Sequence, residues 1–255
     1  MSDFANKRWF ALSLDEVRHT VEKDNTALYK IIPFDILLQI LSDHKIALVN
    51  TSMWDDIYEN FFLNESFYKD GKEVPYHYMS DKFYGQCWSR KGNSDALWRI
   101  YSQDRKGVQI KTSVGKILDS IPDKKDDGGI YLFGKVDYYS QSKIEGDLKS
   151  IKALTDDQFA IIMLQSLLVK RNSFSHESEY RLIYMSKKLF GEGTPIKLLP
   201  IDHHTFIERI CFDPRADDSY VDRCTRLLTQ SFGVPRKKIN KSNLYAFKPL
   251  RFELE

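Results

Sequence analysis

The sequence predicts an α+β (mixed α/β) fold, with a central mixed, mostly antiparallel sheet flanked by helices. Segments in which apolar and polar residues alternate are mixed with segments of helical spacing, without a strict succession of strand and helix. The 255 residues are 42% apolar and 13% aromatic, which is enough for a large core. Because no Pro-, Gly- or Ser-rich linker divides the chain, we expect a helical lead-in over residues 1–26 and a single domain over 27–255.

Caps and periodicity predict the elements of the N-terminal part. Ser13 and Glu16 form a capping box for a short helix over 13–23. Pro33 suits a first helical turn and is followed by apolar residues at helical spacing, which predicts a helix over 33–43. Short β-rich runs predict strands over 28–31 and 46–49.

The middle of the chain is less regular. Residues 53–84 are rich in aromatic and acidic residues without a clean period, so we expect an irregular covering segment. Ser94 is placed to cap a helix that carries Leu97, Ile100 and Tyr101. Further strands are predicted over 87–89, 107–112 and 130–139, with a turn over 123–129.

In the C-terminal half, Thr155 and Gln158 form a capping box for an apolar helix that runs to about Lys170. The clearest later strand covers 179–185, and if it begins early enough, Glu177, Glu179 and Arg181 share one face. The remaining predictions are strands over 196–199, 206–212 and 244–252 and a helix over 219–232.

Charge and cysteine usage exclude several classes of protein. Lys and Arg number 38 against 36 Asp and Glu, a net charge of +2, so composition indicates no bulk attraction to nucleic acid or membrane. Three scattered cysteines suit neither a disulfide framework nor a zinc site.

The first ten residues lack the apolar run of a secretory signal, and no apolar stretch approaches the roughly 20 residues that span a bilayer. We therefore expect a cytoplasmic protein with no membrane partner. We predict no metal, because His203 and His204 have no third ligand at metal spacing.

The first candidate site is an acidic, aromatic loop formed by Trp54, Asp55, Asp56 and Glu59. Carboxylates accept hydrogen bonds from cations and ribose hydroxyls, and an indole stacks on planar rings. The loop is therefore a candidate to bind a ligand or an acceptor. The alternative is a helix N-cap with solvated neighbours.

The second candidate is the pair Glu177 and Glu179 with Arg181. These groups are costly to bury unless paired, so we expect them to line a cleft or to form an ion-pair ladder. A glutamate in a cleft can act as a general base or stabilise an oxocarbenium-like transition state. The alternative is cross-strand salt bridging on an exposed sheet face.

Two weaker groups follow. Trp88 could stack on a base or a nicotinamide ring, and Arg90 could contact a phosphate, although such a tryptophan also suits the core. Basic residues could hold phosphates if they lie on one side, and otherwise form a solvated face; they are Lys170, Arg171, Arg236, Lys237, Lys238 and Lys241.

As an ordered set, six motifs over about residues 27–250 resemble a bacterial family of unknown function, domain-of-unknown-function family 2971. They are Leu28-Tyr29-Lys30, Trp54-Asp55-Asp56 through Glu59, Cys87-Trp88-Ser89, Leu97-Trp98-Arg99-Ile100-Tyr101, Lys106-Gly107-Val108-Gln109-Ile110 and Glu177-Ser178-Glu179-Tyr180-Arg181. The chain has Trp54-Asp55-Asp56 where many members have Asn-Asp-Pro. The family name carries no established activity.

A more distant resemblance is to the ADP-ribosyltransferase superfamily, which includes toxins and phage-defence enzymes. Those enzymes carry a basic residue or His on an early strand, a Ser, Thr or Tyr on a following strand and a Glu on a late strand. Tyr29 or Lys30, then Ser89, then Glu177 or Glu179 have that order. The resemblance implies an ADP-ribosyltransferase-like fold, NAD as substrate, a nucleic acid or protein acceptor, and an antitoxin or defence-system partner.

The same resemblance implies a role for each residue. Glu179 would stabilise the positive charge that develops on the ribose, and Glu177 would activate the acceptor. The NAD-binding residues would be Tyr29, Lys30, Trp88, Ser89, Arg90 and Arg181.

Two other functions stay open at this point. In a metal-dependent nuclease or nucleic-acid-binding module, Asp55, Asp56, Glu177 and Glu179 would gather a divalent ion while basic clusters hold phosphates. In a non-catalytic sensor or interaction domain, the same acids would be structural.

Overall fold

The computed structural model describes residues 25–61, 65–69, 71–74, 81–122, 129–149, 162–186, 188, 193–247, 249, 251 and 253. These residues pack as two compact units. The first unit contains residues 25–28, Lys45–Arg90 and Ser113–Ile201, and the second contains Tyr29–His44, Lys91–Thr112 and the chain from Asp202 onward. The predicted α+β class is confirmed. The single domain over 27–255 stays a prediction, and the helix predicted over 13–23 lies outside the described residues.

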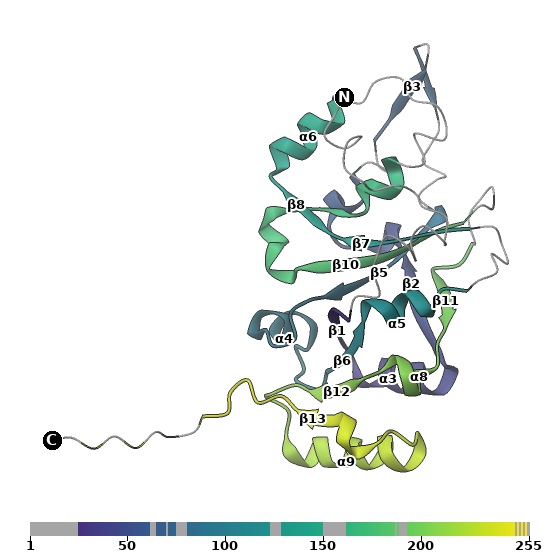
Figure 1. The fold of residues 1–255 in the computed structure, drawn as a ribbon. Coiled ribbons are helices and arrows are strands. Elements are labelled where there is room, and N and C mark those ends of the chain that lie inside the picture. The colour runs from purple at the N-terminus through teal and green to yellow at the C-terminus, as the bar shows by residue number, and fades with distance from the viewer. Residues whose placement is uncertain are drawn as a thin grey trace. The chain divides into compact units, whose positions relative to one another are not determined.

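The first unit is built mainly from strands with short helices between them (Figure 1). In chain order its elements are β2 (Lys45–Asn50), η1 (Thr51–Met53), η2 (Ile57–Glu59), β3 (Phe67–Lys69), β4 (Lys72–Val74), β5 (Phe83–Ser89), α5 (Val114–Asp119), β7 (Ile130–Lys135), β8 (Asp137–Tyr139), α6 (Gln141–Lys149), β9 (Val169–Arg171), η5 (Asn172–Glu177), β10 (Glu179–Met185) and β11 (Ile196–Pro200).

The strands of the first unit pair in the order β11-β2-β5-β10-β7. Strand β10 runs antiparallel to both neighbours, with Glu179 opposite Ser89 on β5 and Tyr180 opposite Lys135 on β7. Figure 1 shows β10 lying between these two strands. Two small sheets accompany them: the antiparallel hairpin β3-β4 and the parallel pair β8-β9. The start of β10 is thus held from both sides.

Alternate apolar residues of these strands bury one face against helical segments. Ile183 on β10 and Leu132 on β7 are almost completely buried, although β7 has a neighbouring strand on one side only. The core cluster joins them to the segment that contains the helical residues 162–166. Its members are Phe61, Phe83, Leu132, Ile144, Met163, Leu164, Leu167, Leu168, Val169, Ile183 and Met185.

The second unit has its own sheet segment and helices. Its elements are most of β1 (Ala27–Ile32), α3 (Phe34–Asp43), α4 (Asp95–Tyr101), most of β6 (Val108–Ser113), α8 (His203–Phe206), β12 (Arg209–Phe212), α9 (Asp218–Ser231), η6 (Arg236–Lys238) and β13 (Ile239–Lys241). The strands lie in the order β1-β6-β12-β13. Strand β12 is antiparallel to β6 and parallel to β13.

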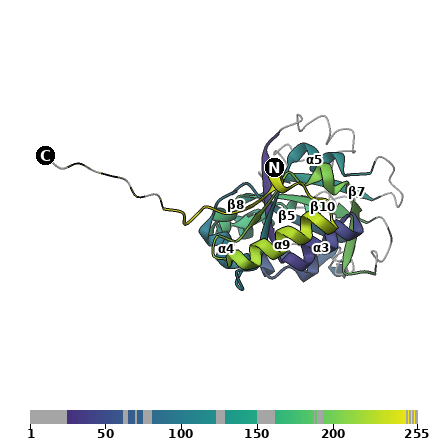
Figure 2. The same cartoon turned by 90° about the horizontal axis from the view of Figure 1, so that it is seen from below.

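Helices α3 and α9 cover one face of these strands, and Figure 2 shows them next to each other. The ring of Phe34 on α3 lies 5.9 Å from that of Phe212 on β12 and 6.1 Å from that of Tyr220 on α9. Edge-on and tilted packing at these distances is favourable for aromatic rings. This contact fixes both helices on the strand face.

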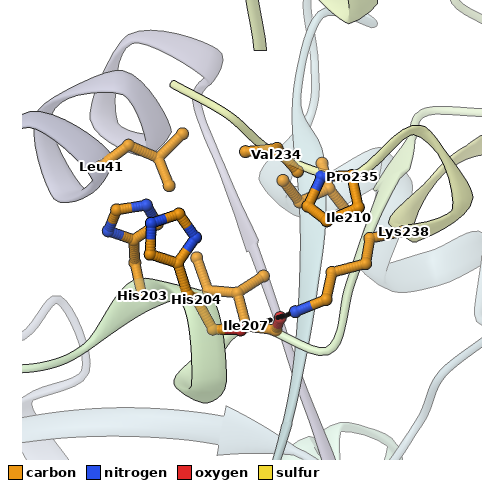
Figure 3. A pocket seen from close by; sticks show the side chains of 8 residues that line it. All are labelled: Leu41, His203, His204, Ile207, Ile210, Val234, Pro235 and Lys238. Atoms are coloured by element: carbon orange, nitrogen blue, oxygen red, sulfur yellow. Dashed lines mark hydrogen bonds between the residues drawn. The ribbon is translucent and has the colours of Figure 1, made fainter. Parts of the chain in front are cut away.

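A histidine pair joins α3 to α8 in the second unit. His44, the C-cap of α3, is in the left-handed region at φ 54°, and its Nδ1 lies 2.9 Å from Nδ1 of His203. His203 and His204 line a small pocket with Leu41, and Lys238 Nζ donates to the carbonyls of His204 and Ile207 (Figure 3). Since one Nδ1 must accept the proton that the other donates, at least one ring of the pair is neutral.

Most predicted elements of the chain are confirmed, including the helices near 33–43, 94–101 and 219–232 and the strands near 28–31, 46–49, 87–89, 107–112, 179–185 and 196–199. Ser94 caps α4 as predicted, since its hydroxyl accepts from the backbone N–H of Leu97. The signals that succeeded are caps and periodic apolar positions, which act locally.

Three predictions in the first unit differ from the structure, and two of them differ because the chain changes partner. The strand predicted over 130–139 is broken at Val136, where the next residue, Asp137, donates its backbone N–H to Leu168 and pairs with β9. The helix predicted to run to about Lys170 ends earlier, because residues 169–171 form that strand. The segment predicted as irregular over 53–84 contains the hairpin β3-β4 and the start of β5.

In the second unit one prediction is partly confirmed and another is wrong. The strand predicted over 206–212 begins later, because residues 209–212 form β12 while residues 203–206 form helix α8, which the Asp202 side chain caps by accepting from the N–H of His204. The edge position beside β12 is taken by residues 239–241, and the part of 244–252 that the structure describes forms no strand.

No helix in the described ranges is both long enough and apolar enough to cross a bilayer.

Candidate active site

The two glutamates of the predicted pair are carried by different local structures. Glu179 begins β10, whereas Glu177 ends the 3-10 helix η5, so the strand does not begin early enough to carry both on one face, the condition on which that prediction depended. Between them Ser178 is in the left-handed region at φ 49°. This conformation is energetically unfavourable for a residue other than glycine, and such backbone strain is often found at functional sites. The left-handed conformation of Ser178 lets the chain pass from η5 into β10 while the carboxylates of Glu177 and Glu179 both reach the Lys170 ammonium.

Three hydrogen bonds hold this turn. The Ser89 hydroxyl donates to the Glu177 carbonyl at 2.5 Å. The Arg90 N–H donates to the Ser178 carbonyl at 3.0 Å. From the other side, the Tyr138 hydroxyl oxygen accepts the Glu179 N–H at 2.9 Å. The backbone that carries the two carboxylates is therefore fixed by the Ser89 side chain, the Arg90 backbone and the Tyr138 side chain.

The ammonium group of Lys170 is the centre of the site. Its Nζ lies 2.5 Å from Glu177 Oε2, 2.9 Å from Glu179 Oε1 and 2.7 Å from Glu59 Oε1. All four side chains are nearly buried, with 6–9% of each exposed. Charge-assisted hydrogen bonds of this length are strong.

Arg181 forms the second cationic centre and is completely buried. Its guanidinium donates to Glu179 at 2.7 Å, to Glu59 at 2.9 Å and to the Leu167 carbonyl at 2.8 Å. The same group lies 4.6 Å from the ring centre of Trp54, a cation–π distance. Arg181 thus fixes one oxygen of Glu179 while Lys170 fixes the other.

The pKa values of the two glutamates are shifted in opposite directions. Burial, together with the hydrogen bond to Glu179, raises the pKa of Glu177 to about 7. Burial alone would also raise the pKa of Glu179, but Arg181, the hydrogen bond from Glu177 and Lys170 hold that pKa well below its ordinary value. The pair therefore contains one fixed negative charge and one group that titrates near neutrality.

Carboxylates of the acidic loop bind three cationic side chains. Glu59 binds the Lys170 and Arg181 centres, whereas Asp56 binds the Arg171 guanidinium at 2.9 Å. That guanidinium also lies 4.3 Å from the ring centre of Tyr58 and 5.5 Å from that of Phe174. Asp55 is exposed. Of the four loop residues predicted, Trp54, Asp56 and Glu59 contact side chains from around the glutamate pair.

Trp54 is held against β5 by the absence of a side chain at Gly85. A Cβ atom built at Gly85 would overlap the indole ring. Glycine at this position lets the ring approach the strand closely and lie under Arg181.

The other predicted residues lie in several places. Trp88 on β5 is 1% exposed, and its indole N–H donates to Gln86. Its ring faces are inside the protein, so stacking on a ligand would require them to be uncovered. Arg90 is exposed. Tyr29 and Lys30 lie on β1 in the second unit, where the Tyr29 ring packs on Gly92. The NAD-binding roles of these residues stay predictions.

Sequence reasoning did not identify Lys170 as a partner of the two glutamates, because it placed Lys170 at the end of a helix and treated the basic run as a solvated face or a phosphate-binding group. A usable signal was present. Four apolar or small residues precede Lys170, which is unusual for a solvated lysine, and two glutamates follow within nine residues. A lysine inside an apolar run needs buried acidic partners.

The acids of the nuclease hypothesis have separate partners, since Asp56 binds Arg171 while Glu177 and Glu179 bind Lys170. Within the described ranges, no three His, Cys, Asp or Glu side chains gather in a way that could hold a metal ion. Where three carboxylates do converge, the Lys170 ammonium lies between them.

Part of the chain matches a known protein family, and the fold is similar to solved structures. Residues 97–182 match the model of a family described as "Protein of unknown function (DUF2971)", which confirms the resemblance over that stretch, and the stretch includes Lys170, Glu177 and Glu179. No curated protein matches the chain.

Two solved structures of DarT from Thermus sp. 2.9 are similar at 14% identity. The complex with NAD+ has a TM-score of 0.41 and the match covers 87% of this chain and 98% of that chain. The complex with ADP-ribosylated ssDNA has a TM-score of 0.40 with 87% and 96% covered.

Proposed function

We propose that the protein is an NAD-dependent ADP-ribosyltransferase that modifies a nucleic acid or a protein. The observation that carries the proposal is the convergence of Glu177 and Glu179 on the ammonium of Lys170, at 2.5 and 2.9 Å. The two carboxyl groups have opposite pKa shifts. Pairs of titratable groups whose environments separate their pKa values are typical of acid–base sites.

Glu179 is suited to stabilise the charge on the ribose. When the bond between nicotinamide and ribose breaks, nicotinamide leaves with the bonding electrons and the sugar becomes oxocarbenium-like. A carboxylate that is already ionised and fixed opposes this charge without reorganisation. Lys170 and Arg181 hold Glu179 in that state, one at each oxygen.

Glu177 is suited to take the proton of the acceptor. As the acceptor hydroxyl or amine attacks the ribose carbon, its proton passes to the Glu177 carboxylate, and the new bond replaces the bond to nicotinamide. A base with a pKa near the working pH is effective in this role. The value of about 7 for Glu177 meets that requirement.

We assign Arg181 a positioning role in this scheme, in place of contact with the pyrophosphate. A completely buried guanidinium that donates to two carboxylates and a carbonyl acts through Glu179. Tyr29, Lys30, Trp88, Ser89 and Arg90 remain the residues proposed to contact NAD. A role as a cytoplasmic toxin or antiphage effector, with an antitoxin partner, belongs to the same proposal.

The experiment is transfer of label from NAD that carries ³²P in its adenylate phosphate. The protein is incubated with total nucleic acid or with lysate, and label in each polymer is counted. We expect transfer by the wild type and none by Glu179→Gln. The matched control is Glu145→Gln, an exposed carboxylate on α6 that contacts Gln141. Absence of transfer to both polymers, or equal transfer by Glu179→Gln, would overturn the proposal.

One observation favours a second function, a non-catalytic sensor or interaction domain. The charged groups of the cluster are all nearly buried, as in a structural ion-pair network. In that case Glu177→Gln and Glu179→Gln would change the stability of the protein and alter no transfer activity.

A further inference from the structure

We infer that Glu59 is a positioning residue of this site, whose surplus negative charge keeps one proton on the Glu177–Glu179 pair. The inference rests on the proposed function for its catalytic consequence. The proton content of the cluster can be measured without NAD.

The position of Glu59 gives it this role. It ends η2, and its N–H donates to the Asp56 carbonyl at 2.8 Å, which fixes the loop. A single oxygen, Oε1, lies 2.7 Å from Lys170 Nζ and 2.9 Å from Arg181 Nη2. Two cationic donors on one oxygen favour the ionised form of a carboxyl group.

Three carboxylates therefore face two cations. Glu59 and Glu179 each contact both Lys170 and Arg181, and Glu177 contacts Lys170. An uncompensated charge is expensive in a buried site, and a carboxyl group responds by taking up a proton. Because Glu59 and Glu179 are each stabilised by both cations, the proton is held most favourably at Glu177.

The remaining charged and titratable neighbours do not remove the surplus. Arg171, beside Lys170 on β9, is neutralised by Asp56. Burial raises the pKa of Tyr138, on β8, to about 12, so this residue is neutral near pH 7. Cys87 on β5 lies opposite Arg181 in the strand register, and a thiolate there would add negative charge. Each of these groups leaves the excess of one carboxylate in place or increases it.

The catalytic consequence concerns the acceptor proton. Glu177 accepts that proton only when it is ionised, so the transfer rate should rise as pH passes through the titration of Glu177. Glu59→Gln leaves two carboxylates facing two cations, and Glu177 should then be ionised at neutral pH.

The test is a ¹³C NMR titration of the full chain labelled at the glutamate side-chain carboxyl carbons, with Glu177 assigned from Glu177→Gln. We expect a midpoint near neutral pH in the wild type and a midpoint lower by about one pH unit or more in Glu59→Gln. The matched control is Glu208→Gln, which removes a partly exposed carboxylate paired with Lys111 at 2.8 Å and should leave the midpoint unchanged.

A double variant separates charge from damage to the fold. Lys170→Met with Glu59→Gln leaves two carboxylates and one cation, the same surplus as the wild type, and should keep a raised midpoint. An unchanged midpoint in Glu59→Gln, or an ordinary glutamate midpoint for Glu177 in the wild type, would overturn the inference. The titration needs no NAD. A shifted midpoint with no transfer activity therefore rejects the proposed function alone, and activity with an unshifted midpoint rejects this inference alone.

Discussion

Lys170 Nζ lies 2.5 Å from Glu177 Oε2, although Lys170 belongs to a strand and Glu177 to the 3-10 helix that follows it. The contact closes a compact turn around a buried positive charge. Because Glu179 and Glu59 reach the same nitrogen, the local fold and the chemistry of the site depend on the same atoms.

Replacement of the buried guanidinium should be severely destabilising. Arg181→Met leaves Glu179 and Glu59 without one of their two cations and the Leu167 carbonyl without its donor. Breaking a buried ion pair in this way costs about 3–5 kcal/mol of the free energy of unfolding. Urea denaturation at pH 7 measures the change. A loss below about 1 kcal/mol would show that the network contributes little.

The close approach of Trp54 can be tested with a pair of glycine variants. Gly85→Ala should push the indole away from Arg181, since the added Cβ overlaps the ring, at a cost of about 1–3 kcal/mol. The control is Gly146→Ala in α6, where nothing lies within 4 Å of the added atom. Removal of a helical glycine there should stabilise by about 0.5–1 kcal/mol. Equal thermal shifts in the two variants would contradict the packing argument.

The raised pKa of Glu177 gives a pH dependence with a definite sign. Its folded pKa, about 7, is above the ordinary value of 4.5, so the stabilisation is complete below about pH 4.5 and is lost as pH rises through 7. Glu177→Gln imitates the protonated form at every pH. Relative to the wild type, we expect the variant to gain stability from pH 5 to pH 8 in urea denaturation. A constant difference over that range would mean that Glu177 titrates normally.

The His44–His203 pair should make the second unit sensitive to acid. Burial and the nearby charges of His204 and His44 lower the pKa of His203, so the unfolded chain binds more protons below about pH 6.5. The contribution of neutral His203 is complete above that pH and is lost as pH falls. Native-state hydrogen exchange of β12 amides at pH 7.5 and 5.5 should show reduced protection in the wild type and a smaller reduction in His203→Gln. Equal reductions would exclude His203 as the titrating group.

Much of the fold follows from local patterns. Helices α3, α4 and α9 and strand β10 were predictable because caps and apolar periodicity act over a few residues. The errors lie where tertiary partners decide the structure. After Lys135 the chain stops pairing with β10, and Asp137 pairs with β9. Residues 239–241 pair with β12, whereas the last strand was predicted over 244–252. No local signal identifies such a change of partner.

The sequence predicts most of the residues that form the candidate site, but it does not predict which of them contact one another. The motifs identified Glu177, Glu179 and Arg181 and the acidic loop, since buried charges must be paired. They did not identify Lys170 as the common partner or reveal that Glu59 completes the cluster. The contacts of Glu59 join segments more than 100 residues apart and depend on how the strands are ordered. Lys170 is only 7 and 9 residues from Glu177 and Glu179, and the three side chains meet because β9, η5 and β10 fold back on one another.

Nicotinamide release from NAD is the most direct test of the central claim, that Glu179 supports cleavage of the nicotinamide–ribose bond. The full chain is incubated with NAD and nucleic acid, and free nicotinamide is quantified by chromatography. We predict release by the wild type and by Glu145→Gln, and a loss of about 100-fold or more in Glu179→Gln, the effect of removing one preorganised electrostatic partner. Release that is absent from the wild type, or undiminished in Glu179→Gln, would contradict the account.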